Sequence, residues 1–199
     1  ELDGAERVHA ASVVNAAGPW AGAVAALAGV NLPVLPRRGV VLVTQPLPML
    51  IRRKVYAAEY VSDVASSHPG LESSAVVEGT PSGTVLIGAS RERVGFEAGM
   101  PLHVVRRLAT QAVALFPVLA GVRLLRTYHG FRPYCPDHLP VIGEDPRTPG
   151  LVHACGHEGA GIVLAAGTGQ LVAEVLAGGT GSMDLSPFRP GRFEGERHG

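Results

Sequence analysis

One arginine in the sequence stands in a setting that suits the binding of an anion. Arg132 lies in the segment HGFRP (residues 129–133), beside aromatic and proline residues rather than in a charged, solvated run. A guanidinium cannot lose its proton, so an arginine in apolar surroundings needs an anionic partner. That partner is either a protein carboxylate, for which Asp137 is the candidate, or the carboxylate of a substrate held by two parallel hydrogen bonds.

A glycine-rich segment offers a second kind of chemistry. Residues 156–163 read GHEGAGIV and stand between an expected strand and an expected helix. A loop of this kind presents unpaired N–H groups and the positive end of a helix dipole to an electron-rich ligand. It is not the GxGxxG fingerprint of dinucleotide-binding proteins, and the sequence contains no such fingerprint. On its own, the loop indicates either a ligand site or an ordinary turn before a helix.

A third segment, VVNAAGPW at residues 13–20, is a β-branched run that stops at small residues. Small residues at the end of a strand allow a flat ligand to approach the backbone closely. An ordinary turn between a strand and a helix is the alternative interpretation.

The elements that position these segments follow from periodicity and from the turn residues. The order of elements predicts an α+β protein, in which a β-rich insert at 37–130 separates two strand–helix segments, 1–36 and 131–199, that form one lobe. The sequence TPSG at 80–83 indicates a hairpin. The expected strands are 11–17, 39–44, 55–60, 75–78, 84–89, 123–130, 139–143 and 151–155, and the expected helices are 21–27, 101–116 and 161–177.

The composition narrows the class of protein. The 17 basic and 17 acidic residues cancel, which argues against nucleic acid or an anionic membrane as a partner. Neither of the two most apolar stretches is an uninterrupted run of about twenty apolar residues, so we expect no transmembrane helix. Cys135 and Cys155 form neither a disulfide framework nor a zinc-binding spacing, which predicts a cytoplasmic protein with reduced cysteines and no metal.

Taken together, the three segments resemble the family of D-amino-acid oxidase, glycine oxidase and monomeric sarcosine oxidase. The resemblance rests on the order NAAGPW (15–20), GFRPYCPDHLPVIG (130–143) and GHEGAGI (156–162), and it extends over nearly the whole chain. It implies an FAD-dependent oxidoreductase that oxidises the C–N bond of an amino acid or a secondary amine acid by hydride transfer to the flavin. It also implies a flavin-binding lobe from 1–36 and 131–199, with a substrate lobe at 37–130.

The resemblance assigns roles to individual residues. Arg132 is expected to bind the substrate carboxylate, which favours the substrate over Asp137 as its partner. Tyr56 and Tyr60, in the insert that is expected to cover the substrate, are further candidate substrate contacts, with plain packing as the alternative. The expected cofactor contacts are Ala17, Gly18, Trp20, Arg38, Gly39, Gly156, His157, Glu158, Gly159, Ala160, Gly161, Ile162 and Val163.

Three departures from the family pattern lead to further expectations. The nucleotide-binding N-terminal part of the family is expected to be missing, so that a separate N-terminal half or a partner subunit would complete the FAD site. Cys135 directly precedes Pro136 and is displaced from the position that carries a covalent flavin in sarcosine oxidase, so the FAD is expected to be non-covalent. The form GHEG is closer to subunits of opine and hydroxyproline dehydrogenases. Together with the absence of the dinucleotide fingerprint, it gives the alternative function: a non-catalytic or structural subunit, or a fragment, of such a heteromeric flavin dehydrogenase.

Overall fold

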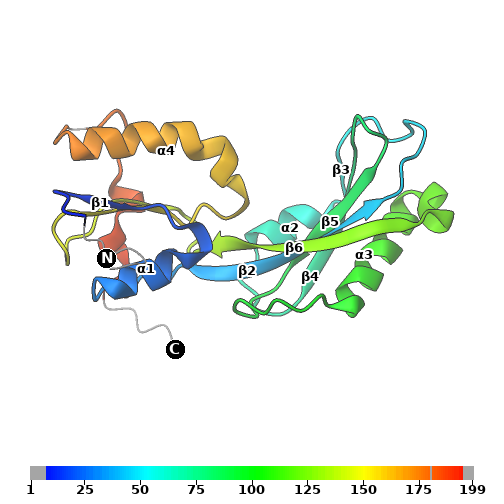
Figure 1. Cartoon of the computed structure of the whole chain (residues 1–199), viewed down its shortest axis with the longest axis horizontal. Coiled ribbons are helices and arrows are strands. Elements are labelled where there is room, and N and C mark those ends of the chain that lie inside the picture. The colour runs from blue at the N-terminus through cyan, green and yellow to red at the C-terminus, as the bar shows by residue number, and fades with distance from the viewer. Residues whose placement is uncertain (1–7, 180, 195–199) are drawn as a thin grey trace. The chain divides into compact units, whose positions relative to one another are not determined.

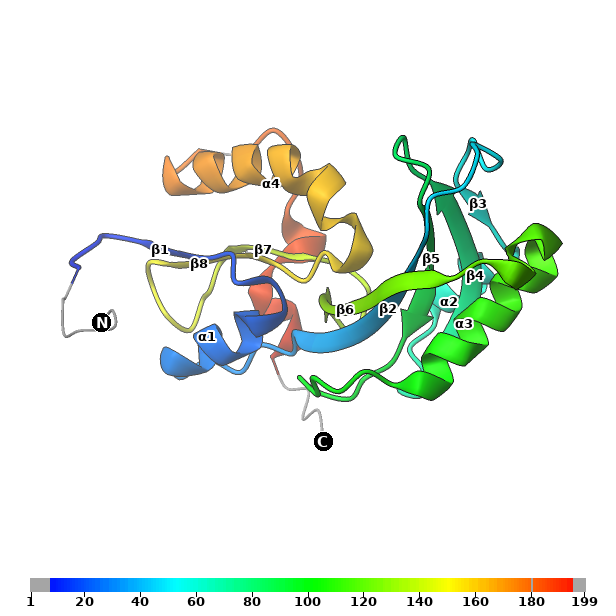
Figure 2. The same ribbon diagram turned by 45° about the vertical axis from the view of Figure 1, so that its right-hand side comes forward.

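The computed structural model describes residues 8–179 and 181–194, and the chain divides into two compact units. Unit 1 consists of residues 1–35 and 133–199, and unit 2 consists of residues 36–132. The boundaries expected from the sequence lie after residues 36 and 130. The elements of each unit can be followed in Figure 1 and in the turned view of Figure 2.

Unit 1 is built on a three-stranded sheet in the order β1-β8-β7. Strand β1 (Val13–Asn15) runs parallel to β8 (Leu151–Cys155), and β7 (Val141–Glu144) runs antiparallel to β8. The helices of this unit are α1 (Ala21–Leu27) and α4 (Gly161–Leu176), with short 3-10 turns at Gly18–Trp20, Glu158–Ala160, Ser186–Phe188 and Pro190–Phe193.

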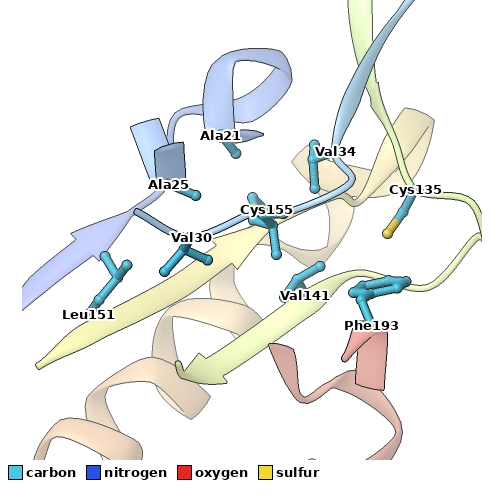
Figure 3. Close-up of a cluster of buried hydrophobic side chains, with 10 residues drawn as sticks. Ala21, Ala25, Val30, Val34, Cys135, Val141, Leu151, Cys155 and Phe193 are labelled. Carbon is cyan, nitrogen blue, oxygen red and sulfur yellow. The ribbon is translucent and has the colours of Figure 1, made fainter. Parts of the chain in front are cut away.

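The side chains of the unit 1 sheet alternate between two cores, as the two-residue period of a strand requires. On one face, Leu151 and Cys155 pack with Ala21 and Ala25 of α1, as Figure 3 shows. On the other face, Val152 of β8 packs with Leu171 and Val172 of α4. Helices α1 and α4 therefore cover opposite faces of the sheet.

Unit 2 contains a five-stranded sheet in the order β3-β4-β5-β2-β6. Strand β4 pairs antiparallel with both β3 and β5, and β5 pairs antiparallel with β2. The strands are β2 (Leu35–Thr44), β3 (Val55–Tyr56), β4 (Glu72–Gly79), β5 (Val85–Arg91) and β6 (Leu124–Tyr134); the helices are α2 (Glu59–Ala65) and α3 (Leu102–Leu115), with a 3-10 turn at Pro117–Gly121.

Helix α3 packs on this sheet through a stripe at helical spacing. Val104, Leu108 and Ala112 are four residues apart, fully buried, and part of one cluster with Val40 and Ile87 of the sheet. The interval of four residues places all three side chains on one face of the helix. The amphipathic helix expected at 101–116 is thus confirmed with ends that differ by one residue.

The structure corrects the expected strand at 55–60. Only Val55 and Tyr56 form a strand, and helix α2 starts at Glu59, so Tyr60 lies on a helix. The aromatic and β-branched residues of 55–61 favour a strand, but the segment folds as a helix against β4. The expected strand at 11–17 is also shorter, since β1 covers only 13–15. The hairpin at 80–83 is confirmed between β4 and β5.

The sequence predicts no transmembrane helix, but one helix meets the length and composition criteria for a membrane span. Residues Glu158–Leu176, which include α4, are long and apolar enough to cross a membrane by length and composition, and only 11% of the apolar window is buried. Gln170 and Glu174 are too few to interrupt this stretch. A single helix of this kind is weak evidence for a membrane span, because length and composition alone also select helices that do not cross a membrane.

Candidate functional site

Unit 2 holds a cavity of about 240 Å³ that contains Arg132. Strands β2, β4, β5 and β6 all contribute to it, together with Tyr60 from α2. The cavity joins two of the predicted substrate residues, Arg132 and Tyr60. It adds three polar side chains that the sequence did not single out for this site, namely Lys54, Glu78 and Tyr128. Tyr56 is not among its lining residues.

The position of the Arg132 guanidinium is fixed by contacts with the backbone of Ser90 and Gly39. Its Nη1 donates a hydrogen bond to the carbonyl oxygen of Ser90 (3.1 Å). A Cβ placed on Gly39 would overlap Nη1 and lie 2.9 Å from Cζ, so the guanidinium rests directly on the backbone of Gly39. Gly39, expected as a cofactor contact, therefore has a structural reason to be glycine within unit 2.

Arg38, the neighbouring predicted cofactor contact, is buried and bound inside unit 2. Its Nε donates to Glu92 Oε1 (2.9 Å), and its Nη1 donates to the carbonyl oxygens of Glu97 (3.1 Å) and Gly99 (3.2 Å). These bonds satisfy a buried charge and give the side chain a structural role in this unit.

The two tyrosines pack on each other. The ring centroids of Tyr56 and Tyr60 lie 4.8 Å apart, and the guanidinium carbon of Arg91 lies 4.7 Å from the Tyr60 centroid.

Lys54 and Glu78 form an ion pair in the lining of the same cavity. Nζ of Lys54 lies 3.1 Å from Glu78 Oε2, and the hydrogen bond to this carboxylate raises the pKa of Lys54. Lys54 is therefore a fixed positive charge at neutral pH, paired with a negative one.

The other predicted segments lie together in unit 1. Strands β1 and β8 are neighbours and parallel, with Asn15 opposite His153. Since the carboxyl ends of parallel strands meet at one edge of a sheet, the segments that follow them, 16–20 and 156–163, leave from the same edge. The structure thus brings two of the three sequence motifs to one place.

A buried network holds the first of these segments. Asn15 Nδ2 donates to the carbonyl oxygen of Ala21 (2.9 Å) and lies 3.2 Å from His153 Nδ1, while Asn15 Oδ1 accepts from the N–H of Ala17 (3.3 Å). His153 Nε2 lies 3.0 Å from Asp145 Oδ2, and Asp145 also accepts two hydrogen bonds (2.8 Å each) from the guanidinium of Arg147. The turn after β1 is therefore fixed on both sides of Ala17.

The protonation states in this network follow from its partners. Burial lowers the pKa of His153, against the opposing effect of Asp145. Burial alone would raise the pKa of Asp145, but hydrogen bonds from Arg147 and His153 keep it below its usual value. A neutral His153 that donates from Nε2 to the carboxylate has a lone pair on Nδ1, which accepts from Asn15. The sequence signal for this network was a histidine at an inward-facing position of β8.

The backbone of the two segments is open toward solvent at this edge. Gly18 adopts φ +55°, Gly156 adopts φ +77°, and a Cβ on Gly18 or Gly159 would meet no atom within 4 Å. Neither His157, which precedes the turn at Glu158–Ala160, nor Ala160, which precedes helix α4, makes a side-chain capping hydrogen bond, so the start of α4 presents backbone N–H groups. A Cβ on Gly161 would touch only His157 Cβ, at 3.4 Å.

Apolar side chains surround this open backbone. Trp20, on the turn after β1, is 55% exposed, and Ile162 and Val163, in the first turn of α4, are 94% and 86% exposed. Ala160 also faces solvent as the residue that precedes α4. Backbone donors with exposed apolar neighbours are suited to a flat, electron-rich ring.

Two polar side chains of the loop are held by the protein. His157 Nε2 lies 3.0 Å from Thr168 Oγ1, and burial lowers the pKa of His157. Glu158 Oε1 lies 2.7 Å from His138 Nδ1, and both residues adopt left-handed backbone, with φ of 48° and 59°. Because such a conformation is unfavourable outside glycine, the pair holds the loop in a geometry it would not otherwise keep.

Asp137, the protein carboxylate that the sequence offered as a partner for Arg132, forms an ion pair with another arginine. Asp137 is bound by Arg192, whose Nε lies 2.6 Å from Asp137 Oδ2.

Both cysteines are buried. Burial raises the pKa of Cys135, and it raises the pKa of Cys155 to about 12. Across residues 8–179 and 181–194, no group of three or more histidine, cysteine, aspartate or glutamate side chains is placed to hold a metal ion.

Comparison with known proteins points to one family. The model of the DAO family, described as FAD dependent oxidoreductase, matches residues 1–175. The chain is 31% identical over 196 residues to the hydrogen cyanide synthase subunit HcnC of Pseudomonas aeruginosa, and 32% identical over 188 residues to the glycine oxidase of Geobacillus kaustophilus. These matches cover 98% and 94% of this chain, but 43% and 46% of the relatives.

Solved structures agree. The crystal structure of the Geobacillus kaustophilus glycine oxidase superposes with a TM-score of 0.77 at 29% identity, over 94% of this chain and 45% of that one. The L-proline dehydrogenase from P. horikoshii superposes with a TM-score of 0.78 at 26% identity, over 92% of this chain and 47% of that one. The chain spans less than half the length of these relatives, and it belongs to the DAO family of FAD-dependent oxidoreductases.

Proposed function

We propose that the protein oxidises the C–N bond of an amino acid or a secondary amine acid, with FAD as the hydride acceptor. The observation that carries this proposal is the cavity of about 240 Å³ in which Arg132 lies with Tyr60 and Tyr128. A guanidinium at a small cavity that two tyrosines also line suits a carboxylate on a small organic molecule. The names of the relatives, glycine oxidase and L-proline dehydrogenase, describe amino-acid substrates for those proteins.

The residues of unit 1 fit a flavin. Uncapped N–H groups at the start of α4, open glycine backbone at Gly18 and Gly159, and the exposed side chains of Trp20 and Ile162 meet the needs of a flat ring that carries negative charge when reduced. Both thiols are buried and held neutral, which supports non-covalent binding.

The rest of the FAD site is proposed to come from outside this chain. The chain covers 43% of the Pseudomonas relative, which is itself named a subunit. We propose that another part of the protein, or a partner subunit, supplies the contacts to the nucleotide half of FAD.

Bound FAD would supply the hydride acceptor, and the residues of this chain would orient the substrate. Arg132 would hold the carboxylate by two parallel hydrogen bonds and so fix the position of the α-carbon. The Ser90 carbonyl and the backbone of Gly39 fix the plane of this guanidinium before substrate arrives. A substrate that binds with a neutral amine needs no general base from these residues.

The test compares Arg132→Leu with Arg132→Lys in the FAD-loaded protein. For an amino acid, Arg132→Leu should lower kcat/KM by roughly thirty- to several-thousand-fold, while Arg132→Lys recovers only part of the loss because it lacks the fork of donors. For a matched amine without a carboxylate, kcat/KM should change far less. Arg123→Leu, an exposed arginine just before β6, is the control. An equal loss for both substrates, together with a lower Tm, would give Arg132 a structural role and refute the proposed substrate class.

A further inference from the structure

The backbone fixes the orientation of the Asn15 amide behind the turn that follows β1. Nδ2 of Asn15 donates to the carbonyl oxygen of Ala21 (2.9 Å), and Oδ1 accepts from the N–H of Ala17 (3.3 Å). A carbonyl oxygen only accepts and a backbone N–H only donates, so these two groups determine which end of the amide faces each of them. Nδ2 of Asn15 is therefore also the atom that faces Nδ1 of His153, 3.2 Å away.

This orientation determines the charge of His153. Because Nδ2 of Asn15 is a donor, Nδ1 of His153 must accept, and the ring proton must lie on Nε2, where it is donated to Asp145 Oδ2 (3.0 Å). The three side chains are buried, so bulk water does not replace a lost partner. Only the neutral ring with its proton on Nε2 satisfies both neighbours.

A proton added to Nδ1 would change one side of the ring only. Nε2 donates to Asp145 in both charge states, so that hydrogen bond remains. On the other side, the new N–H and the amide N–H of Asn15 would be two donors that face each other. A reversal of the amide would set Oδ1 against the carbonyl oxygen of Ala21 and Nδ2 against the N–H of Ala17. With or without this reversal, protonation removes hydrogen bonds from the network that holds the turn.

The groups around His153 keep its ring neutral at pH 7. Burial lowers the pKa of His153, and Arg147 lowers it further, against the opposing effect of Asp145. Strand β1 and helix α1 have no titratable side chain, and β7 places a glycine opposite His153. Cys155, two residues along β8, is a neutral thiol because burial raises its pKa, and Arg192 has a carboxylate partner of its own.

We propose that neutral His153 positions the turn at 16–20 through Asn15, and that protonation of Nδ1 releases this turn and weakens the binding of FAD. The proposal rests on the proposed function, in which this turn carries Gly18 and Trp20 to the flavin. His153 is buried and acts through Asn15, so it is a positioning residue rather than a catalytic one.

The experiment uses Trp20, the single tryptophan of the sequence, which lies in the turn at Gly18–Trp20. Trp20 fluorescence of the flavin-free chain is measured between pH 7.5 and pH 4.5, and circular dichroism checks that the chain stays folded. The expected result is one reversible change with a midpoint below the usual pKa of histidine. The dissociation constant of FAD should rise by up to about tenfold for each pH unit below this midpoint, because one proton is bound.

The variant His153→Gln separates protonation from structure. The carboxamide oxygen of glutamine can accept from Asn15 and its nitrogen can donate to Asp145, but glutamine does not titrate. Trp20 fluorescence should therefore match the parent chain at pH 7.5 and stay constant on acidification. His157→Gln, a matched change at the other buried histidine of this edge, should keep the parental titration.

The variant Asn15→Asp tests the contact between Asn15 and His153 independently of the glutamine variant. A carboxylate accepts a hydrogen bond from a protonated Nδ1 and adds a negative charge beside it. The pKa of His153, followed by the NMR signals of its ring, should therefore rise. An unchanged or lower pKa would mean that the two side chains do not interact as the distances indicate.

Other outcomes would also overturn the proposal. Trp20 fluorescence that does not change with pH would mean that protonation leaves the turn in place, and a change that persists in His153→Gln would assign it to another group. An FAD dissociation constant that does not follow the fluorescence would separate the turn from the cofactor. No amino-acid substrate enters these measurements, so the role of His153 and the proposed substrate class can fail separately.

Discussion

The close approach of Arg132 to Gly39 allows a test of the proposed substrate site that removes no functional group and only displaces the guanidinium. In Gly39→Ala, the new Cβ would overlap Nη1 of Arg132 and lie 2.9 Å from Cζ. Carbon atoms in contact lie about 3.5–4.0 Å apart, so the guanidinium must withdraw by about 0.6–1.1 Å. The end of an arginine side chain moves easily, so the free energy of unfolding should change by no more than about 1 kcal/mol.

The displacement should still be costly for catalysis. A misplacement of about 1 Å in a group that positions the substrate lowers the rate by about a hundredfold. We therefore expect Gly39→Ala to lower kcat/KM for an amino acid by about that factor and to change kcat/KM for an amine without a carboxylate by less than about threefold. The assay is steady-state turnover of both substrates by the FAD-loaded protein, with urea unfolding measured in parallel.

The control is Gly130→Ala, on the same strand as Arg132. A Cβ at Gly130 would meet no atom within 4 Å, so this variant should match the parent protein in both assays. If Gly39→Ala retains its kcat/KM for amino acids while Gly130→Ala behaves as expected, Arg132 does not position the carboxylate, and the reasoning is refuted.

Three further predictions concern unit 1. His153→Phe should lower the free energy of unfolding by about 2–6 kcal/mol, because it leaves two buried partners, Asn15 and Asp145, without a hydrogen bond; the exposed His103→Phe on α3 should have little effect in the same urea titration. Because burial lowers the pKa of His153 and of His157, the unfolded chain binds more protons below about pH 6.5. The free energy of unfolding should therefore be highest above this pH and fall as the pH decreases below it, and the fall should be smaller in His153→Phe. The measurement is the urea midpoint at pH 7.5 and at pH 5.5. A midpoint that is higher at pH 5.5 would contradict this. Acid precipitation of the FAD-loaded protein should release the yellow colour into the supernatant, whereas colour that stays in the pellet, and is lost in Cys135→Ala, would show a covalent link.

Local sequence signals predicted helices and turns well where apolar residues recur at one regular interval or where the turn residues are distinctive. Helix α3 repeats its buried residues at intervals of four, and the TPSG hairpin has its own turn chemistry, so both could be predicted from the sequence. Strand β6 continues through Pro133, which the expected end at residue 130 did not anticipate. Proline is tolerated there because β6 stands at the edge of its sheet.

The contacts of the candidate site were harder to predict, because they join residues that are distant in the sequence. The family resemblance is confirmed, but the sequence contains no local sign that Gly39 lies under Arg132, or that Arg38 is bound to Glu92. The link from Asn15 to His153 likewise depends on the pairing of β1 with β8. Periodicity describes one element at a time and carries no information on such pairings.

The parallel pairing of β1 with β8 also determines when unit 1 can fold during synthesis. Asn15 and His153, which face each other in this pairing, are 138 residues apart. At about 5–20 residues per second, a ribosome needs roughly 7–28 s to make the intervening chain. Unit 2 is one continuous segment, 36–132, and can fold within that interval, while the β1 segment waits without its partner strand. Val13 and Val14 are therefore the residues of this sheet that need protection from aggregation for longest in the cell.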